Sequence, residues 1–281
     1  MTVDKRRKAR SRWWPVRAMT AAVFVCAAHD IEAQNTSSTA ETNPSIGELI
    51  RAFETVVFGT EFQEFDNLTG RSRVWKWETP LRVVVRRFRA RFVDAADGGQ
   101  RSILEQVPVT DQQVASVETH LNTLASLTGL RTEDAATVGE SPNFVINFVP
   151  RHQMSNPALA DLNPRLMGRM ASQGGCFFAS WPKKETGQLH RAVIVVNAEL
   201  GDGKVRHCLL EEMTQALGLP NDVRVRWPSI FSEGKKVTGL SDYDQLFLRT
   251  LYDTRIKAGM SKSEGLRVAR KILAERARST N

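Results

Sequence analysis

RHCLLEEMTQALGLPND, residues 206–222, is the stretch from which the fold of this chain is best predicted. Residues four apart on a helix share a face, so His207, Glu211 and Gln215 would form one stripe. Gly218 stands where a helix commonly ends in a left-handed residue. An unbroken apolar run at residues 193–196, VIVV, is typical of a strand covered on both faces. The sequence therefore predicts a helix over about residues 204–217 that follows a buried strand.

The same stretch has the spacing of a zinc-endopeptidase motif, with other residues at the metal-binding positions. That motif is HExxHxxGxxH, in which histidines hold the metal and the glutamate polarises a metal-bound water. Here the pattern is EExxQxxGxxN, with Glu211, Gln215 and Asn221 at the ligand positions. Glu212 occupies the general-base position, and Asp222 adds a further oxygen donor. Oxygen donors suit calcium or magnesium better than zinc, so we expect either no cofactor or a divalent cation.

His207 lies one helical turn before Glu211 and allows two interpretations. It is either a histidine at the surface or edge of the core, or a metal partner for Glu211. Likewise, two adjacent glutamates followed by a glutamine are often a solvated helix face. The glycine at the expected spacing and the acid after the turn favour a functional site.

The N-terminal part of the chain predicts export. A basic run leads into an apolar stretch at residues 18–28 that is too short to span a bilayer, which is the pattern of a signal peptide over residues 1–33. An uncleaved membrane anchor is the alternative. Residues 34–45 are polar and predict a flexible linker, and residues 46–281 predict a single domain with no membrane span. The expected location is periplasmic or secreted.

Charge gives little evidence for a polyanionic partner. The whole chain has a net charge of +8, but residues 1–33 hold seven basic and three acidic side chains, so removing them leaves +4. A charge of this size does not by itself predict nucleic-acid binding. The basic side chains of one expected strand suit either an acidic envelope surface or a solvated strand edge, and they are Arg82, Arg86, Arg87, Arg89 and Arg91.

The cysteine count predicts one disulfide. Cys26 would be removed with the signal peptide, which leaves Cys176 and Cys208 as an even pair. In an oxidising compartment such a pair is expected to be bonded, linking a strand to the start of the central helix. Two buried free thiols are the alternative.

The remaining patterns place strands before a run of helices, which predicts an α+β protein. Phe144, Ile146 and Phe148 alternate as in a half-buried strand, and Trp75 and Trp77 are expected in the core. Residues 151–173 show no clear period. The other expected elements are helices that start near residue 46 and at the capping boxes of residues 110, 241 and 261, and strands within residues 73–92, 175–181 and 190–197.

The chain resembles a bacterial family of exported proteins, domain of unknown function 2927, in residues 206–222, in PSIF at residues 228–231 and in LSDYDQLFLRTLYDTRIKAGMS at residues 240–261. That family in turn resembles the metzincin zinc peptidases. In this resemblance Ile230, between Ser229 and Phe231, stands where metzincins have the methionine of a turn below the metal. The resemblance implies a zincin architecture, with a mixed sheet, an active-site-type helix, C-terminal helices and a cleft.

The expected ligands Glu211, Gln215, Asn221 and Asp222 include no histidine, so a zincin-like fold does not by itself imply hydrolysis. The favoured hypothesis is non-hydrolytic binding of an extended peptide or envelope component along an edge strand near Phe177. One alternative is an active metal-dependent peptidase with Glu212 as general base. A second alternative is a basic adaptor for acidic envelope surfaces.

Overall fold

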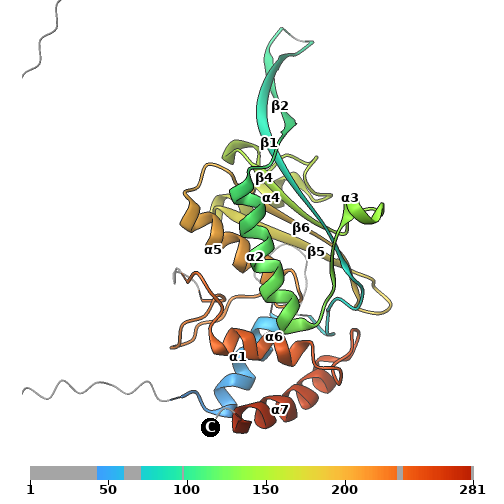
Figure 1. Cartoon of the computed structure of the whole chain (residues 1–281), viewed down its shortest axis with the longest axis vertical. Coiled ribbons are helices and arrows are strands. Elements are labelled where there is room, and N and C mark those ends of the chain that lie inside the picture. Colours follow the sequence, from blue (N-terminus) through green and yellow to red (C-terminus); the bar gives the residue numbers. More distant parts are fainter. Residues whose placement is uncertain (1–42, 60–70, 97, 233–236, 280–281) are drawn as a thin grey trace, which may run out of the picture. The chain divides into compact units, whose positions relative to one another are not determined.

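The computed structural model of the chain (Figure 1) describes residues 43–59, 71–96, 98–232 and 237–279. The predicted signal peptide and most of the predicted linker, residues 1–42, lie outside the described residues. Residues 41–281 fall in one compact unit. No helix within the described ranges combines the length and apolar character needed to cross a bilayer.

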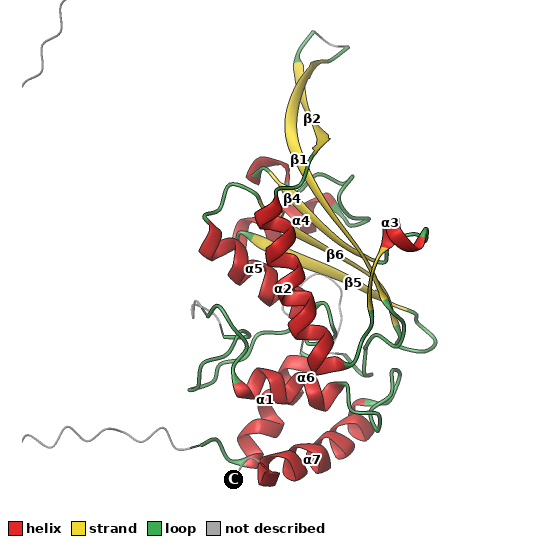
Figure 2. Ribbon diagram, viewed as in Figure 1, coloured by secondary structure: helices red, strands yellow, loops and turns green. Residues whose placement is uncertain are grey.

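Helices and strands alternate in the first two thirds of the unit, and helices alone form its C-terminal third (Figure 2). In chain order the described elements are α1 (Ile46–Phe58), β1 (Leu81–Asp94), β2 (Gln100–Val107), α2 (Asp111–Thr128), β3 (Thr132–Asp134), α3 (Ala135–Val138), β4 (Phe144–Val149), the 3-10 helix η2 (Arg151–Gln153), α4 (Pro164–Gln173), β5 (Cys176–Pro182), β6 (Leu189–Asn197), α5 (Asp202–Gln215), α6 (Asp242–Leu251) and α7 (Lys262–Ser279).

The described strands form one mixed sheet in the order β2-β1-β4-β6-β5, and the short β3 pairs with the start of β1. β1, β4 and β6 are parallel, whereas the outer strands β2 and β5 are antiparallel to their neighbours. The predicted α+β class with a mixed sheet is therefore confirmed. β5, which contains Phe177, is the last strand in this order, so the prediction of an edge strand at Phe177 is confirmed.

Apolar layers cover both faces of the sheet. Phe144, Ile146 and Phe148 of β4 belong to the larger layer, which includes residues of α2, α5 and the C-terminal helices. Val145 and Val149 face a smaller layer formed with the segment after β4 and with α4. The prediction of a half-buried strand was wrong, because all six residues of β4 are buried. Residues 151–173, for which the sequence showed no clear period, therefore cover the second face of the sheet.

The predicted helix caps are present, but the first predicted strand is shorter than expected. Capping boxes start α2 at Thr110 and α6 at Ser241, and Ser261 makes the same contacts with Glu264. β1 begins only at Leu81, and residues 73–80 make isolated bridges instead of a ladder.

The two tryptophans before β1 differ in burial. Trp77 is buried as predicted, with 1% of its surface exposed. Trp75 was expected in the core but is only half-buried, and the Arg71 guanidinium lies 4.0 Å from the centre of its ring. Between them Lys76 points inward, where its Nζ donates to the carbonyl oxygens of Leu251 and Ile256 at 3.0 and 2.9 Å. This segment therefore connects the sheet to the C-terminal helices.

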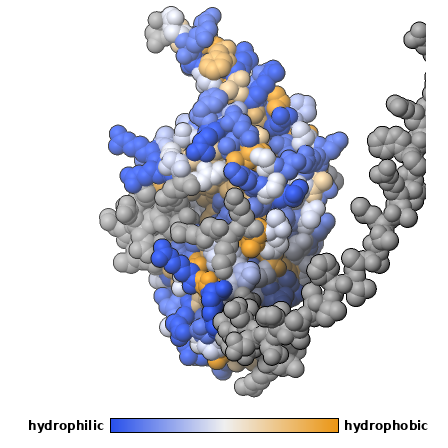
Figure 3. All heavy atoms as spheres, turned by 90° about the vertical axis from the view of Figure 1, so that its left-hand side faces the viewer, coloured by the Kyte–Doolittle hydropathy of each residue, from blue (hydrophilic) through white to orange (hydrophobic). Residues whose placement is uncertain are grey.

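The outer parts of β1 and β2 form a two-stranded ribbon that extends past the rest of the sheet (Figure 1). Because side chains alternate along a strand, Arg87, Arg89 and Arg91 share one face of this ribbon. Glu105 lies on the same face and binds Arg89 at 2.7 Å. Phe92 lies on the other face and is 65% exposed. The ribbon, at the top of Figure 3, is mainly hydrophilic with a small apolar area.

Candidate functional site

The helix α5 is fixed at its C-terminal end by two side chains from other elements. The last carbonyl oxygens of a helix lack partners within the helix. Trp77 Nε1 donates to the Ala216 carbonyl at 3.0 Å, and the Tyr252 hydroxyl donates to the Leu217 carbonyl at 2.8 Å. Gly218 then takes a φ of +108°, a left-handed conformation that turns the chain away from the helix. The predicted helix end is thus correct within two residues.

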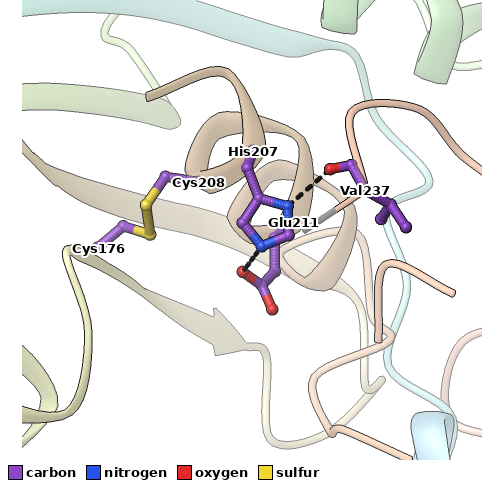
Figure 4. The surroundings of a disulfide bond; sticks show 5 residues. All are labelled: Cys176, His207, Cys208, Glu211 and Val237. Carbon is purple, nitrogen blue, oxygen red and sulfur yellow. Dashed lines mark hydrogen bonds and ion pairs between the residues drawn. A yellow bond between two sulfur atoms is a disulfide. The ribbon is translucent and has the colours of Figure 1, made fainter. Parts of the chain in front are cut away.

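A disulfide joins the first residue of β5 to α5, as predicted (Figure 4). Cys176 and Cys208 are bonded, with their Cα atoms 5.8 Å apart. In the chain-entropy model, closing a loop of this length stabilises the fold by about 3–4 kcal/mol. The bond therefore holds the edge strand against the helix that carries the candidate site residues.

Glu211 and Glu212 lie beside this disulfide. One carboxylate oxygen of each and the Sγ atom of Cys176 are all within 4.8 Å of one another, the one such group of three His, Cys, Asp or Glu residues among those the structure describes. Glu212 is buried, with 7% of its surface exposed, and Glu211 is half-buried. Two carboxylates are therefore held close together at the junction of α5 and β5.

His207 contacts Glu211, and its second ring nitrogen contacts the backbone (Figure 4). Nδ1 is 2.7 Å from the carbonyl oxygen of Val237, and Nε2 is 3.4 Å from Glu211 Oε2. A carbonyl oxygen only accepts, so Nδ1 carries a proton. The contact of Nε2 with a carboxylate is then favourable when the imidazole carries a second proton or when a cation lies between the two groups. The sequence allowed two roles for His207, a histidine at the edge of the core or a metal partner of Glu211. The structure places it in contact with Glu211.

Gln215 and Asn221 each donate a hydrogen bond to Asp222. Gln215 is buried and its Nε2 donates to Asp222 Oδ1 at 2.9 Å. The Asn221 amide nitrogen donates to the carbonyl oxygens of Asp222 and Thr55, at 2.9 and 3.3 Å. Thr55 belongs to the last turn of α1, so Asn221 satisfies a helix end. Of the predicted site residues, the ligand Glu211 and the general base Glu212 lie together, whereas the side chain of Asn221 is directed at α1.

These contacts do not provide the nitrogen donors of a zinc-peptidase site, in agreement with the oxygen donors expected from the sequence. Zinc in such sites is held by neutral nitrogen donors in a tetrahedron. Gln215 and Asn221 have no such nitrogen, because an amide nitrogen has no free lone pair and both are donating to oxygen. Glu211, Gln215 and Asn221 therefore offer oxygen atoms, and no nitrogen donor, to a metal.

The turn at Ser229, Ile230 and Phe231 is buried and is held by one acid from α6. Asp244 accepts from the Ser229 hydroxyl at 2.6 Å and from the Ile230 amide at 3.0 Å. It also caps its own helix by accepting from the Ser241 amide at 2.9 Å. Burial raises the pKa of the Asp244 carboxyl, while these hydrogen bonds act in the opposite direction. Ile230 has no exposed surface and belongs to the larger apolar layer.

Several structural residues around the site were not predicted from the sequence. Lys76, Tyr252 and Asp244 act through contacts with residues far away in the chain, and no local pattern reveals such contacts. Burial lowers the pKa of Lys76 to about 8. The capping box at Ser241 did identify Asp244 as a helix cap, but it gave no sign of the contacts with Ser229 and Ile230.

The edge strand β5 has one open side. The Asn197 N–H donates to the Gly175 carbonyl, and the Ala192 N–H donates to the carbonyl of Asn143, which precedes β4. The backbone N–H and C=O groups of odd-numbered β6 residues therefore point toward β5. In an antiparallel pair the backbone groups alternate in direction. The N–H and C=O groups of Phe178 and Ser180 therefore point away from the sheet, and none of the described backbone groups outside it bonds to them.

Comparison with known proteins identifies the family of the chain. No curated protein and no solved structure matches the chain significantly. One family model matches residues 47–271, which include α1, the sheet, α5 and the turn at Ile230. The chain therefore belongs to the family described as Protein of unknown function (DUF2927).

Proposed function

We propose that this protein is an exported, zincin-like binding protein that holds an extended peptide along the open side of β5 without hydrolysing it. The observation that carries the proposal is the outward direction of the Phe178 and Ser180 backbone groups. An added strand would bond to these groups, and alternate side chains would give specificity. The peptide is expected to come from an envelope component.

The surroundings of β5 support binding more than hydrolysis. The disulfide and α5 hold the strand in place, so little conformational entropy is lost when a peptide pairs with it. A hydrolytic zinc needs donors that Gln215 and Asn221 do not provide. Glu212 would have no metal-bound water to polarise at those positions.

Substitution of Ser180 tests the proposal. Ser180→Pro removes the outward N–H but no ladder hydrogen bond, because that group faces away from β6. Ser180→Ala keeps the N–H and is the matched control. For a peptide selected from a display library, we expect Ser180→Pro to weaken binding about tenfold, the effect of one hydrogen bond, and Ser180→Ala to leave it unchanged.

The measurement is fluorescence anisotropy with the labelled peptide, alongside thermal unfolding of each variant and mass spectrometry of the peptide. Equal binding by Ser180→Pro and the control would contradict strand addition. Cleavage of the peptide that is lost in Glu212→Gln would contradict the non-hydrolytic part and favour the peptidase alternative.

A further inference from the structure

The group formed by Cys176, Glu211 and Glu212 has chemistry that the proposed peptide binding does not use. In the oxidised protein Cys176 Sγ is bonded to Cys208 and is not a thiolate. The group then offers only carboxylate oxygens. Reduction would add a sulfur donor within 4.8 Å of both carboxylates.

The fold brings these side chains together in a defined way. Cys176 and Phe178 of β5 face the larger apolar layer, on the side of the sheet where α5 packs. Cys208, Glu211 and Glu212 lie within little more than one turn of α5. The backbone positions of the group are therefore fixed by sheet and helix as well as by the disulfide.

A thiolate beside two carboxylates is a donor set for a transition metal. Sulfur ligands select zinc over magnesium and calcium, and carboxylate and imidazole donors are also common around zinc. His207 is outside this group of three, but its Nε2 is 3.4 Å from Glu211 Oε2, so it contacts one of the two carboxylates. Its Nδ1 proton is held by the Val237 carbonyl, which fixes the ring beside Glu211, and a carboxylate ligand of a metal is commonly oriented by such a neighbour.

We propose that reduction of the Cys176–Cys208 disulfide creates a zinc site in which Cys176, Glu211 and Glu212 are ligands and His207 orients Glu211. A dithiol reductant supplies two electrons and two protons to the S–S bond and is itself oxidised to a disulfide. Zinc then replaces the proton of the Cys176 thiol, which leaves to solvent. This site differs from the ligand set expected from the sequence spacing, since it uses neither Gln215 nor Asn221.

Charge explains why the site depends on the ion. A thiolate next to two carboxylates is disfavoured by like-charge repulsion. A divalent cation removes that repulsion, and the carboxylates exchange their present contacts for bonds to the metal.

Two single-cysteine variants test the proposal with matched loss of the disulfide. Cys208→Ser leaves Cys176 free inside the group, whereas Cys176→Ser leaves Cys208 free. In zinc titrations against a chromogenic chelator without reductant, we expect Cys208→Ser to bind one zinc at least about tenfold more tightly than Cys176→Ser. Equal affinities, or binding by neither variant, would overturn the site.

The wild-type protein provides a second test that needs no cysteine substitution. Zinc binding should appear when the protein is reduced with a neutral phosphine, and Glu212→Gln should weaken it at least about tenfold. Glu199→Gln, at an exposed position before α5, is the control and should bind as wild type does. Cobalt in place of zinc should give a thiolate-to-cobalt absorption band, and a spectrum without that band would contradict ligation by Cys176. Peptide binding to β5 is measured separately, so failure of either proposal is recognised on its own.

Discussion

Gly218 shows how one residue determines the path of the chain at the candidate site. It has a φ of +108°, and a Cβ atom built there would collide with the carbonyl oxygen of Trp75. The turn leads the chain from α5 to Asn221 and Asp222. The sequence predicted a left-handed glycine here from its position after the helix, but not the contact with Trp75.

Replacing Gly218 should therefore be costly. We expect Gly218→Ala to lower the free energy of unfolding by about 2–4 kcal/mol, since it combines a strained φ with a clash. Gly203→Ala, in the first turn of the same helix, meets nothing within 4 Å and is the matched control. It should leave stability unchanged or raise it by up to about 1 kcal/mol. Urea unfolding measures both, and equal stabilities of the two variants would contradict the argument.

Elements are joined by a few polar contacts as well as by the apolar layers. Asp253, after α6, is 2.9 Å from Arg255 Nε and 3.5 Å from Arg276 of α7. Arg255 in turn binds Glu275 of α7 at 2.8 Å. These contacts hold the connection between α6 and α7 onto α7. A hydrogen bond from Arg255 is the main cause that lowers the pKa of Asp253 to about 2.

This shift predicts a pH dependence of stability. The pKa of Asp253 is lower in the folded protein than its ordinary value of 3.8. The ionised carboxylate therefore contributes its full stabilisation above pH 3.8, and this stabilisation is lost as pH falls toward 2. Asp253→Asn should reduce stability at neutral pH by no more than about 1 kcal/mol, because its partners are half exposed. The difference from wild type should shrink between about pH 4 and pH 2. Urea unfolding across this range is the measurement, with the exposed Asp161→Asn as control, and a constant difference would argue against the pairing.

At the scale of the whole molecule, the basic ribbon and the open edge lie at opposite ends of the sheet. β2 and β5 are the outer strands, with β1, β4 and β6 between them. Arg89 and Arg91 contact Glu105, so part of their charge is balanced within the ribbon. Peptide binding at β5 and attraction of an acidic surface to the ribbon are therefore separable.

We expect the double variant Arg89→Gln, Arg91→Gln to bind the β5 peptide within about twofold of wild type, because distant sites act independently. The measurement is anisotropy at low and moderate salt. Weaker binding in the variant, together with strong salt dependence in wild type, would instead favour the basic adaptor.

Local patterns in the sequence were enough to predict the α+β class, the caps at Thr110 and Ser241, and the end of α5 near Gly218. Each depends on residues within a few positions of one another, where hydrogen bonding and φ are set by the local chain. The Cys176–Cys208 disulfide was predicted from the number of cysteines, since residues 34–281 contain only this pair. The two adjacent glutamates in residues 206–222 lie close to Cys176, and their role as site residues stays a prediction.

Contacts between distant segments were decided by the tertiary structure alone. Asn221 has the spacing of a third ligand, yet its amide satisfies carbonyl groups of Thr55 and Asp222. Burial of β4 on both faces and the inward direction of Lys76 depend on segments far along the chain. The sequence by itself determined the helix and the residues on it. Packing decided which of them meet, because a buried polar group bonds to whichever partner the fold places within reach, whatever its spacing in the sequence.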